Sequence, residues 1–137
     1  MTRAEKLSVV EKLLTTMNTI CVTGIAMTSE QAADLFTEDC RMELNGQLLC
    51  EGRHNLMLHG RDIQAKLKTW HFNLPFERTV VEGEDVFVYY TCDTVAHDGT
   101  QGRVHDMCIY SVRDGKISGI CEVVHFGGHR VDLESFS

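Results

Sequence analysis

The sequence predicts an α+β fold in which a curved antiparallel sheet wraps over three helices. Two observations support this prediction. The first half of the chain carries helical patterns interrupted by one short hairpin, whereas the last third consists of three long apolar runs. These runs are joined at residues 97–100 (HDGT) and 113–116 (RDGK), and Asp-Gly between alternating apolar runs is a strong hairpin signal. We expect a single domain over residues 1–137.

The first two helices have recognisable ends. Apolar residues recur at helical spacing over residues 7–21, which predicts an amphipathic N-terminal helix. Gly24 stands where a left-handed C-cap residue ends such a helix. Thr28 and Gln31 fit a capping box, in which each side chain bonds the other residue's backbone amide. A short second helix is therefore expected directly after Thr28.

A short hairpin and a third helix follow. Residues 40–51 alternate apolar and polar side chains around Asn45-Gly46, a tight-turn signal. After Gly52, apolar residues at helical spacing predict a third helix whose apolar positions run to Trp70.

The rest of the chain is expected to be strand. Residues 71–83 form an apolar run that contains the only proline, Pro75, and this indicates an edge strand or a bulge. Three long strands are expected at residues 84–97, 101–113 and 116–126. The polar segment 127–137 is expected to be peripheral.

Composition argues against several classes of function. The formal net charge is −7 and the acidic residues are spread along the chain, which argues against nucleic-acid binding. No apolar run reaches the ~18 residues of a membrane span, and acidic residues within the first apolar pattern argue against a signal peptide. Six cysteines occur without a close pair, so we expect free thiols and a cytoplasmic protein. No metal or other cofactor is expected.

Three segments resemble a known family. They are LFTEDCRMEL after the second helix, EGRHNLMLHGR at the start of the third, and YSVRDGKISGICEVVHF at the end. The chain resembles the NTF2-like superfamily, in particular its SnoaL-like branch of small polyketide-cyclase-type proteins. The resemblance implies a cone-shaped fold with an apolar pocket between the helices and the concave face of the sheet. The superfamily contains isomerases, dehydratases, epoxide hydrolases and non-catalytic binding modules, so the fold leaves the function open.

The resemblance also implies site residues. In the dehydratase branch a histidine opens the strand after the third helix, and TWHF places His71 there. Its partner in that branch lies on the next long strand, near Asp93 or His97. In the epoxide hydrolase branch an acid on the last strand takes part, and Glu122 occupies that place.

We therefore expect His71 and Asp93 to form an acid/base pair in the pocket, with Glu122 nearby. The substrate-binding residues expected around this pair are Trp70, Tyr89, Asp106, Cys108 and Tyr110.

Alternative interpretations of these residues remain. His71 could bond a backbone carbonyl at the helix-to-strand turn, and Asp93 could face solvent. His105 and Asp106 are adjacent on one strand, so only one of them can line the pocket. Glu122 is either buried beside an arginine such as Arg41 or Arg103, or active.

Two functions are consistent with the sequence. The first is a cofactor-independent lyase or isomerase that uses acid/base catalysis on a small hydrophobic carbonyl or hydroxyl compound. The second is a non-catalytic module that binds a small molecule or assembles as a dimer. The long strands carry apolar residues on both faces, and the three helices can cover only one. We therefore expect a homodimer that pairs through the outer face of the sheet.

Overall fold

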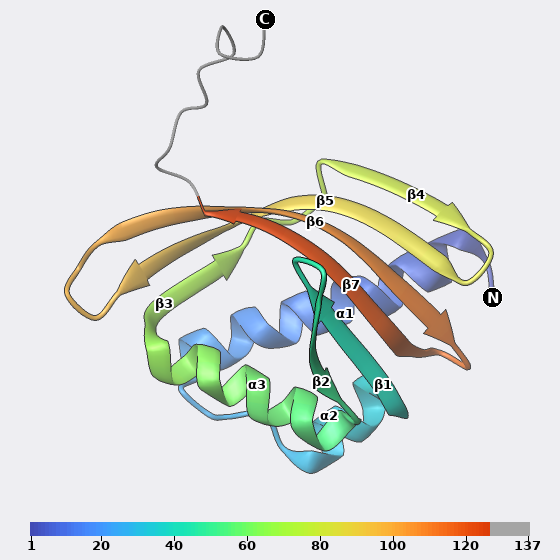
Figure 1. Cartoon of the computed structure of the whole chain (residues 1–137), viewed down its shortest axis with the longest axis horizontal. Coiled ribbons are helices and arrows are strands. Elements are labelled where there is room, and N and C mark those ends of the chain that lie inside the picture. Colours follow the sequence, from blue (N-terminus) through green and yellow to red (C-terminus); the bar gives the residue numbers. More distant parts are fainter. Residues whose placement is uncertain (127–137) are drawn as a thin grey trace, which may run out of the picture.

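The computed structural model describes residues 1–126, which form three helices and a seven-stranded sheet (Figure 1). The helices are α1 (Arg3–Thr23), α2 (Ser29–Leu35) and α3 (Arg53–Lys66). The strands are β1 (Phe36–Leu44), β2 (Gln47–Glu51), β3 (Leu67–Phe72), β4 (Arg78–Glu82), β5 (Asp85–Ala96), β6 (Gln101–Arg113) and β7 (Lys116–Phe126). The expected α+β architecture is confirmed.

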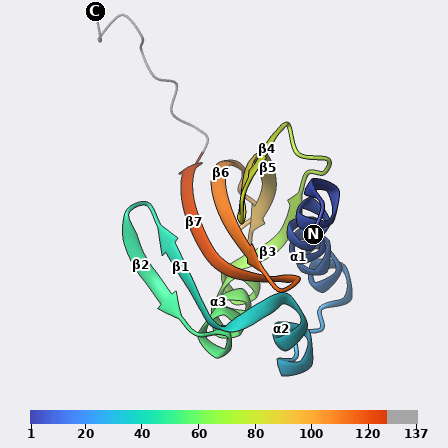
Figure 2. The same ribbon diagram turned by 90° about the vertical axis from the view of Figure 1, so that its right-hand side faces the viewer.

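The sheet has the order β2-β1-β7-β6-β5-β3, and β4 also pairs with β5. We predicted an antiparallel sheet, but the sheet is mixed. Strand β1 runs parallel to β7, while the other pairs are antiparallel. The sheet curves over the three helices, which lie on its concave side (Figures 1 and 2). Within residues 1–126 no helix covers the convex side (Figures 1 and 2).

Local signals in the sequence account for most element ends. Gly24 caps α1 in the left-handed conformation, and its amide donates to the carbonyl of Ile20. Thr28 and Gln31 form the predicted capping box at α2. Asp114, at the β6–β7 turn, has the positive φ that a tight hairpin turn requires.

The prediction for residues 67–83 was partly wrong. Helix α3 ends at Lys66, and the segment from Leu67 to Trp70 belongs to strand β3 instead. Pairing with β5 overrides the helical spacing of the apolar residues, because Trp70 lies directly opposite Thr94 in the ladder. The expected single strand is two strands, β3 and β4, separated by a segment that contains Pro75.

Alternation along the three long strands determines what faces the helices. Val86, Val88 and Tyr90 of β5 are buried, whereas the intervening Phe87 is exposed. On β6 the inward residues begin with Asp106 and are followed by Cys108 and Tyr110, all buried. The inward side chains and the helices form one apolar core, and residues of opposite parity lie on the convex face.

Hydrogen bonds from side chains attach helix α1 to the edge strand β3. Asn18 accepts a hydrogen bond from the backbone amide of Phe72 at 2.7 Å and donates one to its carbonyl at 3.0 Å. Trp70 donates its indole N–H to the carbonyl of Met17 at 2.9 Å. The two Asn18 bonds satisfy backbone groups at the free edge of β3.

We expect Asn18→Ala to lower the free energy of unfolding by about 1–3 kcal/mol, because both backbone groups of the part-buried Phe72 lose their partner. Urea denaturation followed by circular dichroism measures this. Asn55→Ala is the control, since its exposed amide bonds only the carbonyl of Glu51, and it should cost less than about 0.5 kcal/mol. Equal losses in the two variants would contradict a special role for Asn18.

Candidate active site

A cavity of about 110 Å³ lies between the helices and the concave face of the sheet. Helices α1 and α3 and strands β1, β3, β5, β6 and β7 all contribute to it. Most of its wall is apolar, formed by residues such as Leu13, Met17, Met42, Ile63 and Phe72. Its polar side chains are His59, Glu122 and two tyrosines, Tyr90 and Tyr110.

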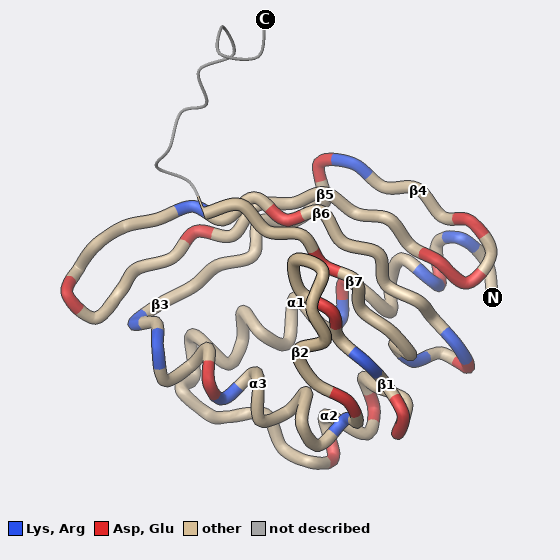
Figure 3. The backbone as a smooth tube through the Cα atoms, in the orientation of Figure 1, with Lys and Arg blue, Asp and Glu red and all other residues tan. Residues whose placement is uncertain are grey.

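Charged residues are scarce in the middle of the long strands. Between residues 86–92, 104–112 and 117–126, Asp106 and Glu122 are the only Asp, Glu, Lys or Arg residues. Figure 3 shows charged positions gathered mainly on helices, turns and strand ends, with acidic positions within β6 and β7. Both carboxyl groups lie on the concave side, where a charge is expensive to bury unless it has a purpose.

Asp106 is buried behind the cavity wall, with only 3% of its surface exposed. Its Oδ1 atom has no hydrogen-bond partner among residues 1–126. Burial, and then the neighbouring Glu122 carboxyl group, raise the pKa of Asp106 to about 10. Asp106 therefore keeps its proton at neutral pH, and the carboxyl pair holds one proton between them.

Two tyrosines extend this polar group along the cavity wall. Tyr90 lies directly opposite Asp106 in the β5–β6 ladder, and its hydroxyl is 3.1 Å from the hydroxyl of Tyr110. Burial raises the pKa of both tyrosines well above the ordinary value. They are therefore neutral donors and acceptors of hydrogen bonds at any pH at which the protein is expected to work.

His59 reaches the cavity from α3, on the opposite side from the sheet. Burial lowers its pKa, although the nearby Glu122 and Asp62 act in the other direction. The imidazole is therefore neutral at pH 7 and can accept a proton. The half-buried His59 also lines a groove between β2 and α3 with Leu49 and Leu58, which places it between the cavity and the outside.

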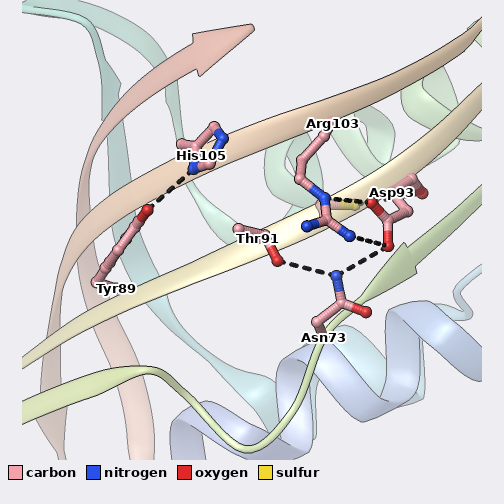
Figure 4. Close-up of polar contacts among 7 residues, drawn as sticks. Asn73, Tyr89, Thr91, Asp93, Arg103 and His105 are labelled. Carbon is pink, nitrogen blue, oxygen red and sulfur yellow. Dashed lines mark hydrogen bonds and ion pairs between the residues drawn. The ribbon is translucent and has the colours of Figure 1, made fainter. Parts of the chain in front are cut away.

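The expected His71–Asp93 pair is not part of this cavity. His71 and Asp93 do lie opposite each other in the β3–β5 ladder, but on the convex side, where His71 is exposed. Asp93 accepts hydrogen bonds from Arg103 at 2.7 and 3.1 Å and from Asn73 at 3.1 Å (Figure 4). The Arg103 guanidinium, followed by Asn73, lowers the pKa of Asp93, which makes it a weak base. The prediction of an acid/base pair in the pocket was wrong.

The other predicted site residues divide between the two faces. Glu122 and Tyr110 line the cavity, and Asp106 and Cys108 are buried beside it. Tyr89 lies on the convex face instead, where its hydroxyl is 2.9 Å from Nδ1 of His105 (Figure 4). Trp70 is buried but does not line the cavity, because its indole packs towards α1.

The expected arginine partners of Glu122 and the expected position of His97 can also be compared with the structure. Neither Arg41 nor Arg103 pairs with Glu122, because Arg41 binds Glu51 and Arg103 binds Asp93. His97 is exposed, and its Nε2 is 2.9 Å from the carbonyl of Ala65.

The sequence prediction missed His59 as a site residue. Nothing in the sequence shows that this face of α3 lies across the cavity from Glu122 of β7. Within residues 1–126 no group of three or more His, Cys, Asp or Glu side chains is arranged to hold a metal ion. No helix of this part of the chain is long and apolar enough to cross a membrane.

Replacing Asp106 with Asn should change how stability depends on pH. The pKa of an aspartate in an unfolded chain is about 3.9, so its raised value in the fold means that stability falls as pH rises from about 4 towards 10. Asn stays neutral throughout. We expect Asp106→Asn to be as stable as the parent near pH 4 and more stable by over ~1 kcal/mol at pH 8. Urea titrations across this range measure the difference, and parallel pH profiles would contradict a protonated Asp106.

Comparison with known proteins places this geometry in a family. The SnoaL-like domain matches residues 10–120. No curated protein sequence matches the chain.

Solved structures share the fold at low sequence identity. An NTF2-like protein from Anabaena variabilis superposes with a TM-score of 0.70 at 15% identity, covering 94% of this chain and 95% of its own. A candidate ketosteroid isomerase from Kribbella flavida has a TM-score of 0.67 at 18% identity, with 97% and 87% covered.

An epoxide hydrolase from M. tuberculosis, described as LEH-like, has a TM-score of 0.67 at 17% identity, with 89% and 84% covered. Identities this low establish the fold and not the activity. With the family match over most of its length, the chain belongs to the SnoaL-like family and has an NTF2-like fold.

Proposed function

We propose that this protein is a cofactor-independent lyase or isomerase that moves protons on a small hydrophobic carbonyl or hydroxyl compound. One observation carries the proposal: Glu122 lines a single apolar cavity, the carboxyl group of Asp106 is buried beside it, and the imidazole of His59 lies on the opposite wall. Solved structures with the same fold include a candidate ketosteroid isomerase and an epoxide hydrolase, which supports an enzymatic function.

The directions of the pKa shifts suggest the roles. The carboxyl pair of Asp106 and Glu122 retains a proton at neutral pH, whereas His59 does not. Groups whose pKa values are pushed apart in one site can act as acid and base. In the proposed reaction, His59 accepts the proton from the carbon next to a carbonyl group, and Glu122 passes the proton held by Asp106 to the far end of the substrate.

The proton from Glu122 can go to two places. If Glu122 delivers the proton to a leaving hydroxyl group, the reaction is the loss of water. The electron pair of the broken C–H bond then forms the new C=C bond as the C–O bond breaks. Delivered to another carbon, it completes a shift of the double bond. Asp106 is a positioning residue in both cases, since it lies behind the wall and shares its proton with Glu122.

Hydrogen–deuterium exchange next to the carbonyl group of small ketones, followed by NMR in D₂O, tests this proposal without knowledge of the substrate. We expect His59→Gln to slow the exchange by about 100- to 10,000-fold, because His59 takes the proton from that carbon. His54→Gln on the same helix and His71→Ala on the convex face are controls that should retain the parent rate. Activity should rise with pH through a midpoint below 6.5, because His59 must lose its proton and burial lowers its pKa.

Absence of exchange with every ketone, while ligands still bind, would instead favour the second function. In that case the cavity belongs to a binding module without chemistry. The use of six cysteines without a disulfide-bonded pair supports our further proposal of a cytoplasmic protein.

We also propose that the convex face of the sheet pairs with a second copy of the chain. This face carries exposed apolar residues that are between 43% and 65% accessible: Val80, Phe87, Met107 and Val123. They surround a shallow apolar groove of about 440 Å³. Monomeric proteins rarely leave such a continuous apolar surface in water.

Charge favours a second copy as the occupant. Arg78 and Glu82 stand at the two ends of β4, on the same face as Val80 between them. An isologous pair of copies turned end for end would place the arginine of one copy against the glutamate of the other. The same face can therefore complement itself in both shape and charge.

A charge swap tests this dimer. We expect Arg78→Glu to weaken dimerisation by about 3- to 30-fold, because it sets like charges against each other, and the double variant Arg78→Glu, Glu82→Arg to restore it. Sedimentation equilibrium of the parent and both variants measures the association. A monomeric parent at micromolar concentration, or no rescue in the double variant, would count against this arrangement.

A further inference from the structure

The size of the cavity suggests what kind of compound it holds. Its volume is about 110 Å³, and a dry apolar cavity of roughly 150 Å³ in another protein is large enough for benzene. The space here is therefore suited to one small ring or a short branched chain. A fused-ring compound would require the helices to move away from the sheet.

The charges around the cavity limit the ligand further. The cavity lining contains no lysine or arginine, and its ionisable side chains other than tyrosine are His59 and Glu122. Burial keeps the imidazole neutral, so nothing in the wall offers a positive charge to a carboxylate or a phosphate. An anionic ligand would lie beside Glu122 in an apolar space.

Helix α3 forms one side of the cavity through His59, Gly60 and Ile63. Gly60 has no side chain, and a Cβ atom added there would lie 3.9 Å from the Sδ and Cε atoms of Met17, an ordinary contact. A larger side chain at this position would project into the space between α1 and α3. Ile63, one turn along, is only half-buried and also lines the cavity.

We propose that the ligand is an uncharged compound no larger than a single six-membered ring, and that Gly60 and Ile63 set this limit. The inference rests on the proposed function in that it assigns the same cavity. It concerns binding alone, however, and it holds whether or not the bound compound reacts.

Isothermal titration calorimetry at pH 7 with three related probes tests the proposal. Cyclohexanone is the uncharged single ring, 2-decalone is its fused two-ring counterpart, and cyclohexanecarboxylate is the charged ring. We expect the parent protein to bind cyclohexanone at least ~10-fold more tightly than either of the others. Equal or tighter binding of 2-decalone or of the carboxylate would overturn the proposal, as would no binding of cyclohexanone.

Variants of the two wall residues test the assignment. Gly60→Leu should weaken cyclohexanone binding by at least ~10-fold, whereas the matched control Gly60→Ala should stay within about threefold of the parent. Ile63→Ala should gain binding of 2-decalone, and this gain does not depend on whether Gly60→Leu folds. Failure of Ile63→Ala to accept the larger ketone, with its fold intact, would remove Ile63 from the proposal.

The outcomes separate this inference from the proposed function. Cyclohexanone that binds but exchanges no hydrogen would contradict the proposed chemistry and leave the size limit in place. Hydrogen exchange of 2-decalone at the same rate as cyclohexanone would contradict the size limit and leave the proposed chemistry in place.

Discussion

The alternation of side chains along β5, β6 and β7 is the constraint on which the rest of this structure depends. Because successive residues of a strand point to opposite faces, one register fixes both the lining of the cavity and the composition of the convex surface. Glu122 faces the cavity and its neighbours Cys121 and Val123 therefore face outwards. A slip of β6 by one residue against its neighbours would bring Asp106 to the surface and bury His105 and Met107 in its place.

The fold places Asp106 where it reduces stability. A carboxyl group with an unpartnered oxygen could be replaced by an apolar residue of similar size at a gain in stability. Its neighbours do not neutralise it with a positive charge, since the arginines of this region are committed to Asp93 and Glu51. Together with the paired hydroxyls of Tyr90 and Tyr110, it forms a polar strip in an otherwise apolar core. Such a strip is expected where a protein gives up stability for function.

Local signals in the sequence were enough for the fold but not for the site. The cap at Gly24, the capping box at Thr28 and the two Asp-Gly turns depend on neighbouring residues alone, and each was predicted correctly. The boundary after Lys66 was misplaced because pairing with β5 decides it, and helical spacing cannot reveal a distant partner strand. The same limit applies to the site. The resemblance suggested His71 and Asp93, and strand parity could not correct it because parity does not say which face the helices cover. Nothing in the sequence places His59 of α3 at the cavity.

The comparison with solved structures also separates the fold from the site. Proteins at 15–18% identity retain the curved sheet and the helices over nearly the whole chain, so the fold tolerates replacement of most side chains. The proposed chemistry depends instead on a few inward positions of the central strands and on the facing side of α3. One fold can host different functions, because any inward position can present a polar group to the same space. In this chain Glu122 and His59 line that space and Asp106 is buried beside it, so the proposed activity should be sought through these residues.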